Sequence, residues 1–503
     1  MAIAARAWSV SAGAALILLA LAGSHAVAAG EGKLLRFGLS ASPVTLDPRF
    51  ATDAASTRIN RLLYSQLVDF NDQFEAVPAL ARWQAIDSRR YRFTLNPDRR
   101  TFHDGSRVTA SDVKATYDYV LDEANGSPHR GGLLTISAVE VLDPDTVDFV
   151  LNKPDALFPG RLVIGVLPAK LIEGGHPFNQ APAGSGPFEF LEWPIEDRLL
   201  IRRRRDGLTM EFVRVPKPTV RVLKLVRGEL DMIQGDLPYE LVGWLKKREE
   251  VVVESARGTT FAYIGFNMED PVTSRLEVRR AVALAIDRQA IIRYVLGAGA
   301  RPASAILTPD HWAGNPDLPL LERDREEAKK LLRKAGFAGG GPRLVYKTSN
   351  DPFRVRLATI IQDQLAKVGI DVELRTYDWG TFYGDVKAGN FQMYSLAWVG
   401  IKMPDIFRYV FHSGSIPPAG ANRGRFVNAA ADELIERAEA SENLDEQAYY
   451  YRELQALVLD ELPYVPLWYE DQVFAARRGI RGYDVAADGS YDGLTTIENG
   501  RAE

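Results

Sequence analysis

Residues 343–376 constrain the possible folds more than any other part of the chain. Residues 343–347 predict a strand, residues 354–367 predict a helix that ends before Gly369, and residues 370–376 alternate between uncharged and charged side chains as a second strand does. A strand, a helix and a strand of these lengths form a βαβ unit, so the strands are expected to be parallel and the crossover right-handed. The C-terminal part of the chain is therefore expected to form an α/β lobe.

The length of the chain and its lack of cysteine set further limits. At 503 residues it exceeds the roughly 250–300 residues at which a single core stops growing, so more than one lobe is expected. The absence of cysteine excludes disulfides, thiolate catalysis and cysteine-ligated metal. The net charge of −5, from 61 Lys and Arg against 66 Asp and Glu, argues against a nucleic-acid binder, because such a protein needs a concentrated basic surface.

The first residues predict export. Arg6 precedes an apolar run at residues 14–22, and Ala26-Val27-Ala28 fits an A-x-A cleavage site. The run is too short to cross a bilayer, and no later apolar stretch is long enough to do so. We therefore expect a signal peptide at residues 1–28 that is cleaved near Ala28. An uncleaved membrane anchor is the alternative.

A strand, a turn and a capped helix follow one another in residues 91–122. Tyr91, Phe93 and Leu95 alternate with polar residues, as expected of a strand with one buried face. Thr109 then opens a helix with a capping box that Asp112 completes. Strand and turn patterns continue on both sides, so residues 69–184 or thereabouts are expected to form a mixed α+β subdomain.

The sequence of this segment, TFHDGSRVTASDVKATYDYVL, resembles the extracellular solute-binding proteins of family 5, which are the dipeptide-, oligopeptide- and nickel-binding receptors of ABC importers. The resemblance covers nearly the whole mature chain. Further blocks follow the order of the family: LARWQ and YRFTLNP before this segment, then GSGPFEFLEW, VRRAVALAIDRQAIIRYVLGAGARPA, DREEAKKLLRKAGF, IIQDQLAKVGIDVELRTYDW and ELPYVPLWYED.

The resemblance implies a two-lobe fold of the periplasmic-binding-protein kind, in which a hinge closes the lobes around a ligand. Lobe I would comprise residues 33–270 and 477–503, with the extra subdomain inside it, and lobe II would comprise residues 271–476. It also implies a periplasmic monomer that binds a peptide or another small solute without a cofactor. ABC permease subunits at the membrane would be its protein partners.

The chain departs from the peptide receptors where they bind the peptide amine. These receptors carry Trp-x-Gly-Asp, and the Asp pairs with the α-ammonium; here the segment is Trp398, Val399, Gly400, Ile401 and Lys402. An ammonium placed against Ile401 and Lys402 would lose a charge partner worth roughly 2–5 kcal/mol, or about 30-fold to several thousand-fold in affinity. Either another acid satisfies the amine, or the solute has none there.

A second departure concerns the carboxylate of the ligand. In dipeptide receptors an Arg upstream of the helix at residues 354–367 holds it, and Thr348 stands at that position here. Lys402, Arg408, Arg423 and Arg425 make the neighbourhood basic, which permits an anionic ligand. Solvated charges at the rim of the lobe are the favoured explanation of these residues. A peptide or peptide-like solute and a non-peptide solute such as an opine, a glycoside or a metal chelate both stay open.

Other candidate ligand contacts are weaker. Trp398 is expected to offer a flat aromatic face to the ligand, with a core position as the alternative. The loop that contains Ser42, Val44 and Thr45 follows the first predicted strand and matches a ligand-facing loop of the family. Asn267 ends a predicted strand and is expected at the hinge or in the cleft. Asp405 is expected to cap the helix at residues 406–411.

An enzyme is the third hypothesis, a secreted hydrolase. No two of the six histidines stand at a spacing of three or four residues, so no zinc cluster can be assembled from them, and neither a G-x-S-x-G nor a P-loop pattern occurs. His103 and Asp104 lie in a tight turn, where we expect the imidazole to bond main-chain carbonyls. We therefore expect no catalytic and no metal-ligating residue.

Overall fold

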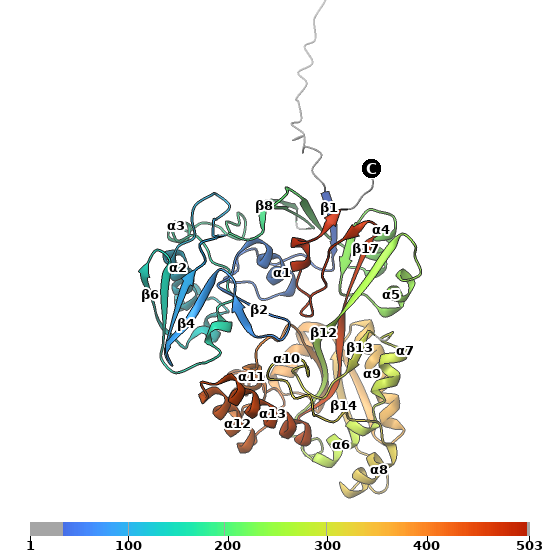
Figure 1. Ribbon diagram of the computed structural model, residues 1–503. Helices are drawn as coiled ribbons and strands as arrows, with labels where there is room; N and C mark the ends of the chain where they lie inside the picture. The colour runs from blue at the N-terminus through green and yellow to red at the C-terminus, as the bar shows by residue number, and fades with distance from the viewer. Residues whose placement is uncertain (1–33, 99, 196, 298, 500–503) are drawn as a thin grey trace, which may run out of the picture.

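The computed structural model describes residues 34–499 apart from residues 99, 196 and 298. The predicted signal peptide, residues 1–28, lies outside the described residues. The chain forms two lobes that two long strands, β12 (Val251–Phe266) and β17 (Tyr464–Arg477), connect (Figure 1). Among the described residues no helix combines the length and the apolarity of a membrane span. The fold is the two-lobe α/β architecture that the sequence predicted.

A single sheet runs through both lobes in the strand order β15-β14-β16-β12-β17-β11-β1-β10-β9-β8, and β13 pairs with β17. In lobe I, β10 and β11 lie parallel to β1 on its two sides, and α4 crosses between them. The elements of this lobe outside the subdomain are β1 (Leu34–Leu39), α1 (Ala54–Leu63), β8 (Phe188–Ile195), β9 (Arg198–Arg203), β10 (Thr209–Arg214), α4 (Pro218–Val226), β11 (Met232–Gln234), α5 (Tyr239–Leu245), β18 (Ile480–Arg481) and β19 (Glu498–Asn499).

Lobe II repeats this arrangement around β14, which lies between β15 and β16 and is parallel to both. Two apolar clusters cover the two faces of the sheet, one with α6, α8 and α9 and the other with α10 to α13. The elements of the lobe are α6 (Leu276–Ala285), α7 (Arg288–Tyr294), β13 (Ala300–Pro302), α8 (Arg325–Lys334), β14 (Arg343–Ser349), α9 (Pro352–Ala366), β15 (Asp371–Tyr377), α10 (Trp379–Ala388), β16 (Met393–Trp398), α11 (Ile406–Phe411), α12 (Ala429–Ala440) and α13 (Leu444–Glu461).

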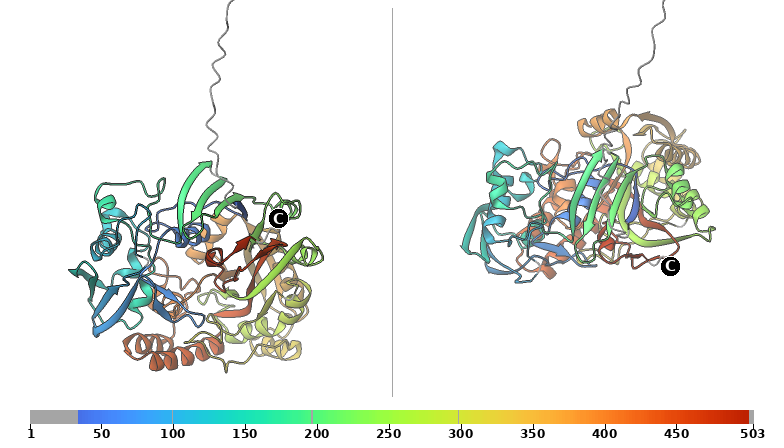
Figure 2. Two further views of the ribbon diagram at one scale, coloured as in Figure 1. Left: turned by 45° about the horizontal axis from the view of Figure 1, so that its top comes forward. Right: turned by 90° about the horizontal axis from the view of Figure 1, so that it is seen from above.

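A subdomain with a core of its own extends from lobe I. Its buried apolar residues fall between Leu67 and Val166, and its four-stranded sheet has the order β4-β5-β7-β6. Figure 2 shows it set to one side of the long strands. Its elements and the short segments that flank it are β2 (Val68–Phe70), β3 (Ala76–Pro78), β4 (Ala81–Asp87), β5 (Arg90–Leu95), α2 (Ala110–Leu121), β6 (Ile136–Asp143), β7 (Thr146–Leu151) and α3 (Ala169–Glu173).

The local predictions from the sequence hold in these elements. The strands β14 and β15 are parallel and α9 connects them, so the βαβ unit is confirmed. The main-chain amide of Thr109 donates to Asp112 Oδ2 at 2.7 Å, which confirms the capping box. His103 Nε2 lies 3.3 Å from the Gly186 carbonyl oxygen, so this imidazole has a main-chain partner as expected.

The sheet changes lobes at a break in the pairing of β12 with β17. The regular register stops between Ala256 and Thr260, where a bulge interrupts the ladder. Gly258 lies in this break, and a Cβ atom placed on it would come within 2.1 Å of the Glu470 carbonyl oxygen. We place the hinge here. The lobe bounds of 270 and 477 expected from the sequence stay a prediction.

The close approach at Gly258 generates a test. Gly258→Ala forces β12 and β17 apart and should lower the unfolding free energy by about 1–3 kcal/mol, the usual cost of overpacking. Gly243→Ala is the matched control, since its Cβ would meet open space on helix α5 and should leave stability unchanged or slightly higher. Urea unfolding midpoints compare the two, and equal midpoints would contradict the assigned hinge contact.

Candidate functional site

The carboxyl ends of the parallel strands in both lobes point towards the hinge. In lobe I, Gln234 at the carboxyl end of β11 pairs with Phe474 of β17, next to the break. In lobe II, Trp398 at the carboxyl end of β16 pairs with Phe261, next to the break in β12. Ligands of open α/β sheets bind outside the carboxyl ends of strands where the strand order reverses. Both lobes therefore present their binding edges to the same space.

The crevice in lobe II lies where β14 and β16 separate. These strands pair only through Tyr346 with Met393 and Lys347 with Tyr394, so their last residues diverge. A cavity of about 220 Å³ occupies this crevice. Its wall comprises Ala262, Tyr263, Tyr346, Thr348, Ser349, Arg354, Leu357, Ile361, Trp379, Phe382, Ser395, Leu396, Ala397, Val399, Leu467 and Trp468.

This wall is aromatic and hydroxylated, with one charged residue. Arg354 Nη1 lies 3.0 Å from Glu470 Oε1 on β17, and the charge of Glu470 raises the pKa of Arg354 above its usual value. Of the described residues that form the wall, none carries a carboxylate. The Ser395 and Thr348 hydroxyls lie 3.5 Å apart and leave hydrogen-bonding capacity for a solute. The cavity therefore suits a largely uncharged solute surface that hydroxyl groups orient.

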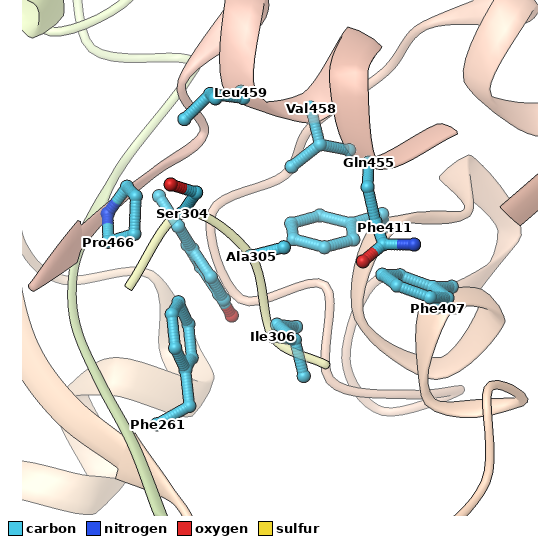
Figure 3. A pocket seen from close by; sticks show the side chains of 11 residues that line it. Phe261, Ser304, Ala305, Ile306, Phe407, Phe411, Gln455, Val458, Leu459 and Pro466 are labelled. Carbon is cyan, nitrogen blue, oxygen red and sulfur yellow. The ribbon is translucent and has the colours of Figure 1, made fainter. Parts of the chain in front are cut away.

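A smaller cavity in lobe II, about 20 Å³, lies among apolar side chains around Phe261 and Phe411 (Figure 3). Gln455 contributes an amide group to its wall. It has room for about one water molecule, so it is a packing void and not a solute site.

Trp398 ends β16 at the edge of the crevice but is not among the residues that line the cavity, although its neighbours Ala397 and Val399 are. There the ring packs edge-on to Tyr409, with centroids 6.3 Å apart, and beneath the guanidinium of Arg423 at 4.8 Å. Direct contact of Trp398 with solute stays a prediction.

The loop after β16 holds the other predicted residues of lobe II. Gly400 has a φ of 69°, in the left-handed region, and faces open space. Ile401 packs against the apolar cluster beneath the loop. The ammonium of Lys402 pairs with Asp488 of the C-terminal segment at 2.6 Å and lies 5.5 Å from the centroid of Phe70 in the subdomain. Lys402 thus connects lobe II to lobe I.

Two titratable groups hold this loop in place. Burial acts to raise the pKa of Asp488, but Lys402 and the Ser490 amide outweigh it and lower the pKa to about 2. Burial lowers the pKa of His311 to about 4, so its ring is neutral at pH 7. The Ala313 amide donates to His311 Nδ1 at 3.0 Å, so Nε2 carries the proton and donates to the Lys402 carbonyl at 3.1 Å.

The predicted loop in lobe I follows β1 at the binding edge. The amides of Val44 and Thr45 donate to Ser56 Oγ at 2.8 and 3.0 Å. These bonds fix the loop on helix α1 and leave the Val44 side chain 74% exposed, while Ser42 is half-buried. Ser42, Val44 and Thr45 therefore belong to the lobe I edge that faces the hinge, and their contact with solute stays a prediction.

Two expectations from the sequence need correction. Asn267 lies at the far end of β12 from the hinge, where its Nδ2 donates to the Gly389 carbonyl at 3.1 Å, so it is neither a hinge nor a cleft residue. Asp405 stands at the N-terminus of α11 but makes no side-chain capping bond. Its carboxylate instead pairs with Arg161 of the subdomain at 2.7 Å.

Of the residues that line the cavity, sequence reasoning named Thr348 and Val399 but did not single out the others. Ser349 ends β14 and Arg354 lies in the first turn of α9, and the rule that ligands bind at carboxyl ends would have found them once β14 was predicted. Trp379 begins α10 after β15 and could have been found in the same way. Asp488 had no local signal. Among the described residues no cluster of three or more acidic or imidazole side chains could hold a metal ion.

Comparison with known proteins gives consistent matches. The sequence model of "Bacterial extracellular solute-binding proteins, family 5 Middle" matches residues 75–416. The dipeptide-binding protein of Escherichia coli K12 is 25% identical, over 93% of this chain and 95% of its own length. Heme-binding protein A of Haemophilus influenzae is 28% identical, over 88% of each chain. The structure resembles DppA of Helicobacter pylori in complex with the peptide STSA, with a TM-score of 0.78, 25% identity and coverage of 93% and 98%.

The Lys402–Asp488 pair predicts a defined pH dependence. The pKa of Asp488 is lower in the folded protein than its ordinary 3.8, so the pair stabilises the lobe contact above about pH 4 and this contribution is lost as the pH falls towards 2. Lys402→Met should destabilise the protein by about 2–3 kcal/mol at pH 7, below the range for fully buried pairs because both side chains keep some exposure.

Urea unfolding from pH 7 to pH 2.5 measures the unfolding free energy of the parent and of Lys402→Met. The difference between Lys402→Met and the parent should shrink at the acidic end. Lys329→Met, which removes an exposed pair with Glu326, should change stability by less than about 1 kcal/mol at any pH. A difference for Lys402→Met that is independent of pH would contradict the assigned pair.

Proposed function

The chain belongs to the bacterial extracellular solute-binding proteins of family 5, and from this premise we propose that it is the periplasmic receptor of an ABC importer. It takes a peptide or peptide-like solute into the cleft between its lobes, where the cavity of lobe II receives it, and delivers the solute unchanged to a membrane permease. The observation that carries the proposal is the cavity at the diverging ends of β14 and β16, which opens beside a two-strand hinge. Its relatives include a dipeptide-binding protein and a peptide-bound DppA.

The contacts between the lobes support capture by closure. Besides Lys402 with Asp488, Arg161 pairs with Asp405 at 2.7 Å, and Phe74 stacks on His311 with centroids 5.6 Å apart. Each contact joins lobe I or its subdomain to lobe II. A solute held in the cavity of lobe II gains contacts from lobe I when the lobes close over it, so its binding favours the closed arrangement.

The amine site of the peptide receptors is rebuilt. Ile401 offers no charge, and the nearest carboxylate that pairs with this loop, Asp488, is neutralised by Lys402. An α-ammonium at this position would meet a cation without a free acid. The solute therefore presents a blocked or absent amine to the Ile401 loop, as an acylated or otherwise modified peptide does.

A non-peptide solute is the second candidate. Two observations favour it: none of the described wall residues of the cavity carries a carboxylate, and one relative is a heme-binding protein, which binds a metal chelate. Opines and glycosides offer the hydroxyl and carbonyl groups that Thr348, Ser349 and Ser395 can orient.

A thermal-shift panel of free and N-acetylated peptides, opines, glycosides and metal chelates tests the proposal. A true solute at 100 times its Kd stabilises the protein by about 2.7 kcal/mol. Ser349→Trp fills the cavity and should abolish the shift with little change in the unliganded midpoint. Lys330→Trp on the exposed face of α8 is the control and should keep the shift.

No shift across the whole panel, or an undiminished shift in Ser349→Trp, would contradict capture in this cavity. Recovery of a chemically altered solute after incubation would contradict the receptor and favour a hydrolase. N-acetylated peptides that shift the midpoint where their free-amine forms do not would support the rebuilt amine site.

A further inference from the structure

Arg423 differs from every other buried arginine in the described part of the chain. Seven arginines are buried, and six of them donate to carboxylates or to main-chain carbonyl oxygens. Arg423, with 7% of its surface exposed, makes no ion pair, and its guanidinium donates only to two tyrosine hydroxyls. The other six are Arg49, Arg100, Arg203, Arg221, Arg279 and Arg288.

The surroundings of Arg423 only partly satisfy its charge. Nη1 lies 3.4 Å from Tyr263 Oη and Nη2 lies 3.0 Å from Tyr383 Oη. The guanidinium also lies over the rings of Trp398, at 4.8 Å, and Tyr383, at 5.2 Å. A guanidinium has five N–H donors, so several have no strong acceptor. A buried cation in such a setting is costly unless an anion joins it.

The guanidinium is separated from the solute cavity by one layer of side chains. Tyr263 lines the cavity, and so do Ala397 and Val399 on either side of Trp398. Tyr383 stacks on Trp379 with centroids 5.3 Å and planes 9° apart. Trp379 also lines the cavity and is 57% exposed, so it can move with Tyr383 at little cost in packing.

We propose that Arg423 is the anchor for a carboxylate group of the solute, which reaches it past Trp379 and Tyr383. This assignment rests on the proposed function and narrows the solute to an acid. The planar fork of a guanidinium matches a carboxylate in two parallel hydrogen bonds, and the Tyr263 and Tyr383 hydroxyls can reorient to donate to the same oxygens. The other cation of the cavity, Arg354, already has Glu470 as its partner. Arg423 is thus the cation at this site whose countercharge the solute supplies.

Matched pairs of solutes test the assignment by calorimetric titration. Each pair comprises an N-acetylated dipeptide, or an opine, as the free carboxylate and as its neutral amide. The carboxylate should bind the parent protein at least about 30-fold more tightly than the amide. Arg423→Gln should remove that preference, because it weakens carboxylate binding much more than amide binding. Arg437→Gln on the exposed face of α12 is the control and should preserve it.

Arg423→Lys keeps the positive charge but loses the planar pair of donors, so it should weaken carboxylate binding about tenfold and amide binding by less. If Arg423→Gln fails to fold, the Arg423→Lys variant tests the carboxylate preference in its place. Equal affinities for carboxylate and amide, or a preference that survives in both variants, would overturn the role of Arg423 while the receptor function stands. Failure of every pair and of the wider panel to bind the parent would instead overturn the proposed function.

Discussion

The antiparallel pairing of β12 with β17 is the constraint on which the rest of the molecule depends. These two strands carry the sheet from one lobe to the other, and their register breaks between Ala256 and Thr260, where Gly258 lets the backbones approach closely. Because β17 pairs antiparallel with β11, β12 with β17 and β16 with β12, the parallel sets of the two lobes run in opposite directions, and the carboxyl ends of β1 and β14 face each other across the break. The binding edges are therefore brought together by topology, before any side chain is considered.

Charge then determines what the cleft can hold. Asp488, the acid that could meet an α-ammonium, is already paired with Lys402. Arg354, the cation that could meet a simple carboxylate, is already paired with Glu470. Arg423 is the exception, held by tyrosine hydroxyls and ring faces alone. The family supplies the capture mechanism, and under the proposed function these three cations select a solute that differs from a free dipeptide. In this view the specificity of the receptor comes from which charges the protein satisfies for itself.

Local patterns in the sequence predicted what depends on neighbours along the chain. The βαβ unit and the capping box at Thr109 are of this kind, because the spacing of apolar residues and the capping side chains can be recognised within a few residues of sequence. The resemblance to the family supplied the two-lobe architecture. Contacts over long separations were out of reach: the pairing of Lys402 with Asp488, the burial of Arg423 and the use of the Asp405 carboxylate by Arg161. Asn267 was misplaced because a strand end in the sequence does not say which end of the sheet it occupies.

The distance across the cleft tests the central claim most directly. The chain has no cysteine, so Val44→Cys on the lobe I edge and Val427→Cys in lobe II, both exposed and neither in the wall of the cavity, can carry a unique pair of spin labels. Pulsed electron resonance then reports the separation of the labels with and without a solute that raises the melting midpoint. A shorter, narrower distribution in the presence of solute is the result expected of two lobes that close at the β12–β17 break. An identical distribution with the solute bound would contradict closure.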